Sequence, residues 1–297
     1  MEIVDAQVHI WSSGTPSPQH RQVSRYTAEE LLSEMTAAGV DAAVIHPPMN
    51  WDPDANDTAL AAAGRYPGRL AVLGQIPLDQ PESRALVDTW KDQPGMLGLR
   101  YELVRPEQRS WHEDGTMDWL WPAAERAGLP VAAMAWRFLP AFKRIAERHP
   151  DLRLVIDHFG LIRPEQNAAA FGNLAELLAL AKLPNIAIKA TGAPGYSTDI
   201  YPFRNIHDGL QRIFDAFGAD RFFWGSDITR MPCSYRRCVT MFTEELPWLA
   251  GHDLERVMGG AVCDWIGWKR DPNLRLAPLR NEPGPTDPPE QPGPQSL

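Results

Sequence analysis

The chain has few cysteines, no long apolar run and no excess of positive charge. Its three cysteines, Cys233, Cys238 and Cys263, form neither an even disulfide framework nor a paired zinc-binding motif. No stretch approaches the roughly 20 apolar residues that span a bilayer. Acidic Glu2 and Asp5 stand where a signal peptide carries basic residues. We therefore expect a soluble, cytoplasmic protein with reduced thiols and no zinc ribbon.

The balance of charge excludes two classes of partner. The chain carries 29 Lys and Arg against 38 Asp and Glu, a formal net charge of −9. A nucleic-acid binder needs clustered positive charge to displace counterions from phosphates, and an anionic membrane surface attracts basic segments. We therefore expect neither nucleic acid nor membrane as a partner. The sequence sets no oligomeric state and leaves a homo-oligomer open.

Length and proline content indicate one large domain followed by a tail. The chain has 297 residues, 44% hydrophobic and 23% charged, which is typical of a globular protein, and α/β barrels often use this length for one domain. Eight of its 28 prolines fall within 269–297, a segment with almost no apolar periodicity. We predict a body over 1–268 and a Pro-rich, partly disordered tail over 269–297.

The body contains eight short apolar runs. Each is nearly continuous in apolar residues, which is typical of strands covered on both faces in a parallel sheet. The runs are 3–6, 42–45, 70–73, 96–99, 131–134, 152–156, 186–188 and 222–224.

Helical patterns separate these runs. Thr27 and Glu30 form a capping box at the start of one helix, and Gly39, in the left-handed conformation, ends that helix. Strand–helix alternation repeated eight times predicts an α/β fold of the (β/α)₈ TIM-barrel type. A doubly wound open sheet is the alternative, but no glycine-rich phosphate turn follows any run. Further helices are predicted at 119–127, 141–148, 174–182 and 203–217.

Polar residues that follow the apolar runs are the candidate site. In a barrel, active residues cluster at the carboxyl ends of the strands, and buried charges there need compensation. Gln7 and His9 lie two apart on the first strand and share a face. The candidates at the other strand ends are His46, Arg100, Glu102, His158, Lys189, Asp227 and Arg230.

Several of these residues have a purely structural interpretation. We expect His46 to be a satisfied structural group. Asp5 and Asp157 alternate to the face opposite the chemistry-bearing positions, and we expect both to be structural hydrogen-bond acceptors. Lys189 is either a solvated charge at the barrel mouth or a substrate-binding residue.

Three segments resemble signature blocks of the amidohydrolase superfamily. They are 4–11 (VDAQVHIW), 156–160 (IDHFG) and 223–227 (FWGSD). The branch they are most similar to is the amidohydrolase-related one, which includes sugar-lactone and pyrone-dicarboxylate lactonases and some decarboxylases. The resemblance covers the body as far as Trp268, and it implies a TIM-like barrel and hydrolysis by a water activated at the barrel mouth.

The chain departs from the family pattern at two metal positions. The first strand normally reads Asp-x-His-x-His, but Gln7 replaces the first histidine. Met134 stands at the end of the fifth strand, where many members place a metal-binding histidine. His9, His158 and Asp227 remain as ligands, and three protein ligands suffice for catalytic zinc. We therefore expect either no required cofactor or one weakly held, zinc-like divalent metal.

The leading hypothesis is a hydrolase of a lactone or related carboxylate-bearing small molecule. Asp227 would be the general base, and His158 and His9 would polarise the carbonyl. Arg100 and Arg230 would grip a substrate carboxylate, because guanidinium matches it in a bidentate way.

In this hypothesis Lys189 and Gln7 would also contact the substrate. One alternative is a metal-dependent decarboxylase of an aromatic acid, against which Gln7 and Met134 count. The other is a non-catalytic ligand-binding barrel, which eleven tryptophans favour slightly.

Overall fold

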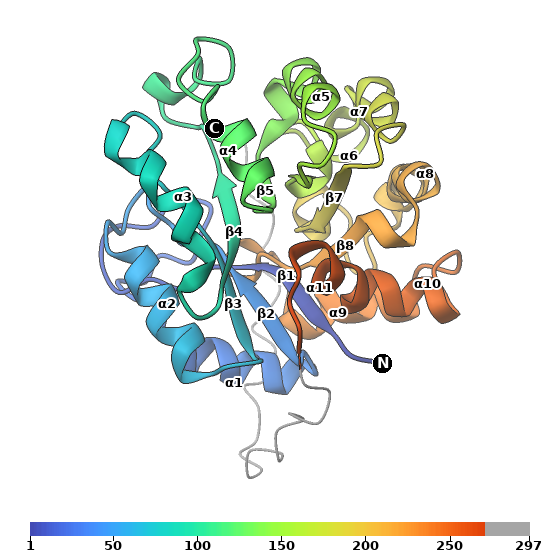
Figure 1. Cartoon of the computed structure of the whole chain (residues 1–297). Helices are drawn as coiled ribbons and strands as arrows, with labels where there is room; N and C mark the ends of the chain where they lie inside the picture. Colours follow the sequence, from blue (N-terminus) through green and yellow to red (C-terminus); the bar gives the residue numbers. More distant parts are fainter. Residues whose placement is uncertain (271–297) are drawn as a thin grey trace.

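Eight parallel strands follow one another in chain order around one sheet, with the helices outside it (Figure 1). This computed structural model describes residues 1–270, so nearly all of the predicted tail lies outside the described residues. The strands are β1 (Val4–Val8), β2 (Ala42–Ile45), β3 (Leu70–Gly74), β4 (Met96–Tyr101), β5 (Val131–Ala133), β6 (Leu154–Ile156), β7 (Ile186–Thr191) and β8 (Phe222–Gly225).

The strand order confirms the (β/α)₈ prediction and excludes the doubly wound alternative. Every neighbouring pair from β1–β2 to β7–β8 is parallel. The backbone N–H of Asp227 donates to the Gln7 carbonyl at 2.9 Å, which joins the end of β8 to β1. β1 and β7 extend beyond the predicted apolar runs and include the polar residues Gln7 and Lys189, whose side chains find partners inside the barrel.

Eleven α-helices lie in the described residues 1–270. They are α1 (Ala28–Ala38), α2 (Ala55–Arg65), α3 (Leu86–Thr89), α4 (Leu120–Arg126), α5 (Leu139–Arg148), α6 (Asn167–Ala170), α7 (Leu174–Leu180), α8 (His207–Phe217), α9 (Tyr235–Glu244), α10 (Gly251–Glu255) and α11 (Ala261–Ile266). Within the same residues, none is long and apolar enough to cross a membrane.

Local sequence signals decide where the helices begin and end. Thr27 accepts from the Glu30 N–H while the Glu30 carboxylate accepts from Thr27, which confirms the capping box of α1. Gly39 ends α1 with φ 80°. The helix predicted from Phe203 begins instead at His207, because Phe203 has φ 62° and a 3₁₀ turn follows it.

The amino-terminal end of the barrel is filled and closed. Small and branched side chains from the strands, among them Val4, Ala6 and Val155, form an apolar cluster there. Helix α11 completes this cluster with Ala261 and Ile266. The barrel is therefore plugged at this end, and the polar residues gather at the opposite, carboxyl end.

Candidate active site

A cavity of about 660 Å³ opens at the carboxyl ends of the strands. Its floor includes His9 and His158, and Trp51, Trp136 and Phe138 form an aromatic wall. Cavities of this size with a few convergent polar groups are typical of small-molecule sites.

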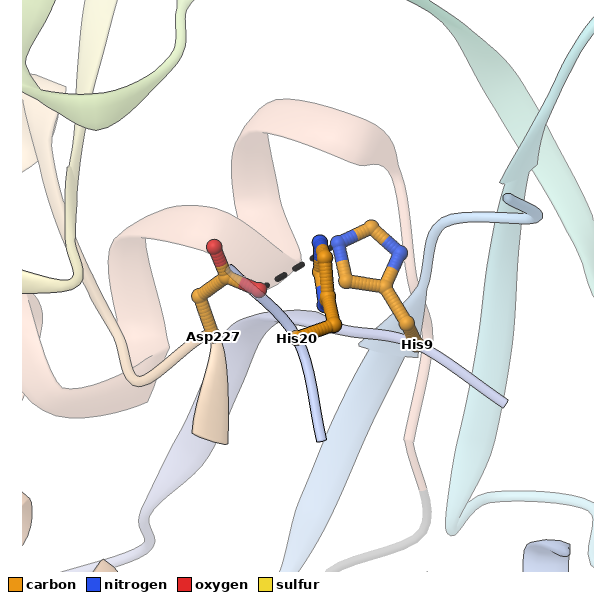
Figure 2. A group of neighbouring side chains, drawn as sticks. All are labelled: His9, His20 and Asp227. Carbon is orange, nitrogen blue, oxygen red and sulfur yellow. Dashed lines mark ion pairs between the residues drawn. The ribbon is translucent and has the colours of Figure 1, made fainter. Parts of the chain in front are cut away.

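His9 and Asp227 meet at the base of this cavity. The Nε2 atom of His9 lies 3.3 Å from Oδ1 of Asp227. His20, from the segment between β1 and α1, lies beside both, with its ring nearly perpendicular to that of His9 and 5.1 Å away (Figure 2). One ligand atom from each of the three residues lies within 4.8 Å of the others.

Hydrogen bonds at the Nδ1 atoms orient the imidazoles of His9 and His20. His9 Nδ1 lies 2.6 Å from the carbonyl oxygen of His46, so this nitrogen carries a proton and donates. In a neutral ring, Nε2 of His9 then presents a lone pair to Asp227 Oδ1, which has no hydrogen-bond partner. His20 Nδ1 lies 2.8 Å from the Thr229 hydroxyl.

This arrangement fits a divalent metal ion. Two acceptors facing each other in a buried site need a proton or a cation between them. Two imidazoles and one carboxylate are a common ligand set of catalytic zinc, and histidine ligands usually hydrogen-bond through their other nitrogen, as His9 and His20 do. The sequence predicted His158 as the second imidazole ligand, but the structure groups His20 with His9 and Asp227.

Sharp turns at the ends of β6 and β8 place His158 and Asp227. His158 has φ 54°, Phe159 φ 57° and Asp227 φ 52°. Left-handed backbone of this kind is uncommon outside glycine and concentrates at functional sites. The turns direct both side chains toward β1, where His158 Nε2 lies 3.1 Å from the amide nitrogen of Gln7.

The protonation of these groups follows from their surroundings. Although burial alone would raise it, the nearby His9 and the Arg230 charge hold the pKa of Asp227 well below its usual range. Burial and the Arg163 charge lower the pKa of His158 well below its usual range. Burial lowers the pKa of His20 to about 3. At neutral pH the site thus holds an ionised carboxylate beside two neutral imidazoles.

Two of the predicted substrate-binding cations are already paired. Arg100 lines the cavity, but it binds Glu102 and, at 2.8 Å, Asp157. Lys189 is buried, with its Nζ 2.8 Å from Asp157 Oδ1, so it is not a solvated charge at the mouth. Asp157 reaches both cations because it follows the end of β6, where strand alternation has stopped. The expectation that Asp157 faces away from the site is therefore wrong.

Two other arginines have N–H groups without a hydrogen-bond partner. Arg230 lies 3.5 Å from Asp227, and its Nε has no hydrogen-bond partner. Arg163 donates from Nε to the Tyr196 hydroxyl at 3.0 Å and leaves one terminal nitrogen unpartnered. Arg163 and His20 were missed by the sequence reasoning because it considered only residues at strand ends. Both lie in βα segments, where the same barrel rule also places functional residues.

The remaining predicted residues lie around this core. The side chain of His46 contacts Lys189 while its carbonyl orients His9. Asp5 is a structural acceptor, since its carboxylate binds Ser226 and Tyr235. Met134 lines the cavity.

Comparison with known proteins places this architecture in a family. The amidohydrolase family model matches residues 4–292. An L-fucono-1,5-lactonase from Burkholderia ambifaria is 27% identical over 283 residues, which cover 88% of this chain and 93% of the relative.

Solved structures agree on the fold. An amidohydrolase from Burkholderia multivorans with bound zinc superposes with a TM-score of 0.74 at 21% identity, over 90% of this chain and 99% of that one. A probable 2-pyrone-4,6-dicarboxylic acid hydrolase from Acinetobacter baumannii with citric acid bound gives 0.69 at 18% identity, over 90% and 100%. The chain therefore belongs to the amidohydrolase family and is a hydrolase.

Proposed function

We propose that the protein hydrolyses a lactone that carries a carboxylate. The observation that carries this proposal is the ionised Asp227, buried beside neutral imidazoles beneath a cavity with unpartnered arginine N–H groups. The lactonase relative and the pyrone-dicarboxylic acid hydrolase structure support the substrate class.

Asp227 is the proposed general base. It accepts a proton from water as the oxygen attacks the lactone carbonyl and returns the proton to the leaving alkoxide. His158 would stabilise the oxyanion that develops on the carbonyl oxygen. His9 gives its Nδ1–H to the His46 carbonyl, so it would contribute only as an imidazolium that donates from Nε2 or as a ligand of a bound metal. A lactone suits this site because its alkoxide leaves more readily than an amine does.

Arg163 and Arg230 are the residues proposed to bind the substrate carboxylate. Of the arginines that line the cavity, Arg100 has its charge balanced by Glu102 and Asp157. Arg230 and Arg163 keep unpartnered N–H groups and repel one another, which lowers the pKa of Arg230 in addition to burial. An anion between them would relieve that repulsion and satisfy these donors.

A weakly held divalent metal of the zinc type fits the same site. His9, His20 and Asp227 would hold it, and the zinc-bound amidohydrolase structure supports this ligand class. When bound, such an ion polarises a carbonyl and lowers the pKa of a coordinated water.

A panel of lactones with and without carboxylates, assayed by pH-stat, tests the proposal. We expect hydrolysis of carboxylate-bearing lactones and a KM at least about tenfold higher for the Arg163→Gln variant. The exposed Arg204 offers the matched control Arg204→Gln. Release of carbon dioxide from an aromatic acid without lactone hydrolysis would overturn the proposal in favour of a decarboxylase.

A further inference from the structure

Lys189 is a buried ammonium that lies beneath the cavity without lining it. Its side chain is 2% exposed, and Nζ lies 2.8 Å from Asp157 Oδ1, 2.9 Å from His46 Nε2 and 3.4 Å from Gln7 Oε1. Burial lowers the pKa of Lys189 to about 8, with Asp157 opposing the decrease, so the group is mainly protonated at neutral pH.

This ammonium sets the orientation of the Gln7 amide. An ammonium can only donate, so the amide oxygen of Gln7 must face Lys189. The amide nitrogen then faces Nε2 of His158, 3.1 Å away. A flipped amide would place its NH₂ against the ammonium, donor to donor, in a site closed to water.

The Gln7 amide in turn sets the tautomer of His158. An amide NH₂ can only donate, so His158 Nε2 must accept and carry a lone pair. The proton of the neutral ring is therefore on Nδ1, which has no partner in the protein. With the lone pair on Nε2, His158 donates no proton toward Asp227 Oδ2, which lies 3.9 Å away.

We propose that Lys189 and Gln7 are positioning residues that hold His158 as the Nδ1–H tautomer, an N–H donor for the developing oxyanion. His158 lines the cavity, and its buried Nδ1–H has no partner in the protein, so this N–H is the donor that remains for a substrate oxygen. Gln7, which replaces a histidine of the family pattern, also contacts Nε2 of His158, so this nitrogen is not free to bind a metal. The role of His158 as an oxyanion donor rests on the proposed lactone hydrolysis, whereas the assignment of its tautomer does not.

The tautomer can be read directly by two-bond ¹H–¹⁵N NMR of protein labelled with ¹⁵N-histidine, with His158→Gln assigning the signal. In the wild type we expect a protonated Nδ1 and an unprotonated Nε2. Gln7→Glu offers only oxygens to His158, so it should move the proton onto Nε2. Lys189→Met should release the amide and give a mixture of tautomers. Exposed Gln80→Glu and Lys143→Met are the matched controls and should leave the signal unchanged.

In kinetics, Gln7→Glu should lower kcat about tenfold or more, with KM within about twofold, because an oxyanion donor is lost. A wild-type His158 protonated on Nε2, or a tautomer unchanged in Gln7→Glu, would overturn the inference. If Lys189→Met does not fold, the wild-type and Gln7→Glu spectra still decide it. If no lactone is hydrolysed but the tautomer is as expected, only the proposed function fails.

Discussion

The Asp5 carboxylate accepts the backbone N–H of Ser226 at 2.9 Å and so bridges the seam between β1 and β8. The same carboxylate accepts from the Gln7 N–H at 2.9 Å and the Tyr235 hydroxyl at 2.6 Å, and from the Ser226 hydroxyl. One buried side chain thus serves four donors on three segments. It holds the two strands whose ends carry His9 and Asp227.

Replacing Asp5 by Ala should lower the free energy of unfolding by about 3–5 kcal/mol, because buried donors lose their acceptor. Urea denaturation monitored by tryptophan fluorescence measures this loss. Tyr235→Phe removes a single donor and should cost about 1–2 kcal/mol. A loss below about 1 kcal/mol for Asp5→Ala would show that the seam does not depend on this carboxylate.

Gly225 should not tolerate a side chain. A Cβ there would lie 3.0 Å from Thr191 Oγ1, 3.1 Å from the Gln7 nitrogen and 3.2 Å from Asp5 Oδ1. We expect Gly225→Ala to lower the free energy of unfolding by about 1–3 kcal/mol. Gly64 in α2 is the matched control, since its Cβ would meet nothing within 4 Å. Gly64→Ala should be neutral or stabilise by up to about 1 kcal/mol. Equal effects of the two substitutions would contradict this packing argument.

Zinc binding should depend on His20 rather than His158. His20→Ala should weaken Zn²⁺ binding at least about tenfold, because a ligand is lost, whereas His158→Ala should change it less than about threefold. Calorimetric titration of the metal-stripped variants measures both affinities. The reverse order would restore the ligand set of His9, His158 and Asp227 predicted from the sequence.

The contribution of the buried Lys189 to the free energy of unfolding should increase with pH. Its pKa is lowered from 10.5 to about 8 in the folded state. Between these values the unfolded chain binds the proton more readily, so the contribution of Lys189 to the free energy of unfolding rises with pH. The slope is at most about 1.4 kcal/mol per pH unit.

The difference in unfolding free energy between the wild type and Lys189→Met should therefore increase from pH 8 to pH 10. Denaturation at several pH values measures this difference. Where the variant does not fold, an NMR titration of the Lys189 side chain gives the pKa directly. A pKa near 10.5, or a difference that falls over this range, would contradict the account.

The sequence predicted the barrel well because its strands are short, fully buried apolar runs. Ala42–Ile45 has the predicted bounds, and the capping box of Thr27 and Glu30 forms as expected. These signals are local, since burial and capping are decided within a few residues. The resemblance to the amidohydrolase superfamily rested on three such local blocks.

The site was harder to predict because its chemistry depends on pairing between distant segments. The sequence shows Arg100 at a strand end, but not that Asp157 neutralises it. It likewise gives no periodic signal for His20 or Arg163, which the irregular βα segments carry to the cavity. Charge pairing and loop path are settled only by the folded chain.

The central claim is that Asp227 is the base of a lactone hydrolysis at the mouth of this barrel. The most direct test compares kcat of the wild type and Asp227→Asn on a lactone that the wild type hydrolyses, with circular dichroism to check the fold. We expect kcat to fall at least about 100-fold while the fold remains intact. A folded Asp227→Asn variant with wild-type kcat would contradict the account.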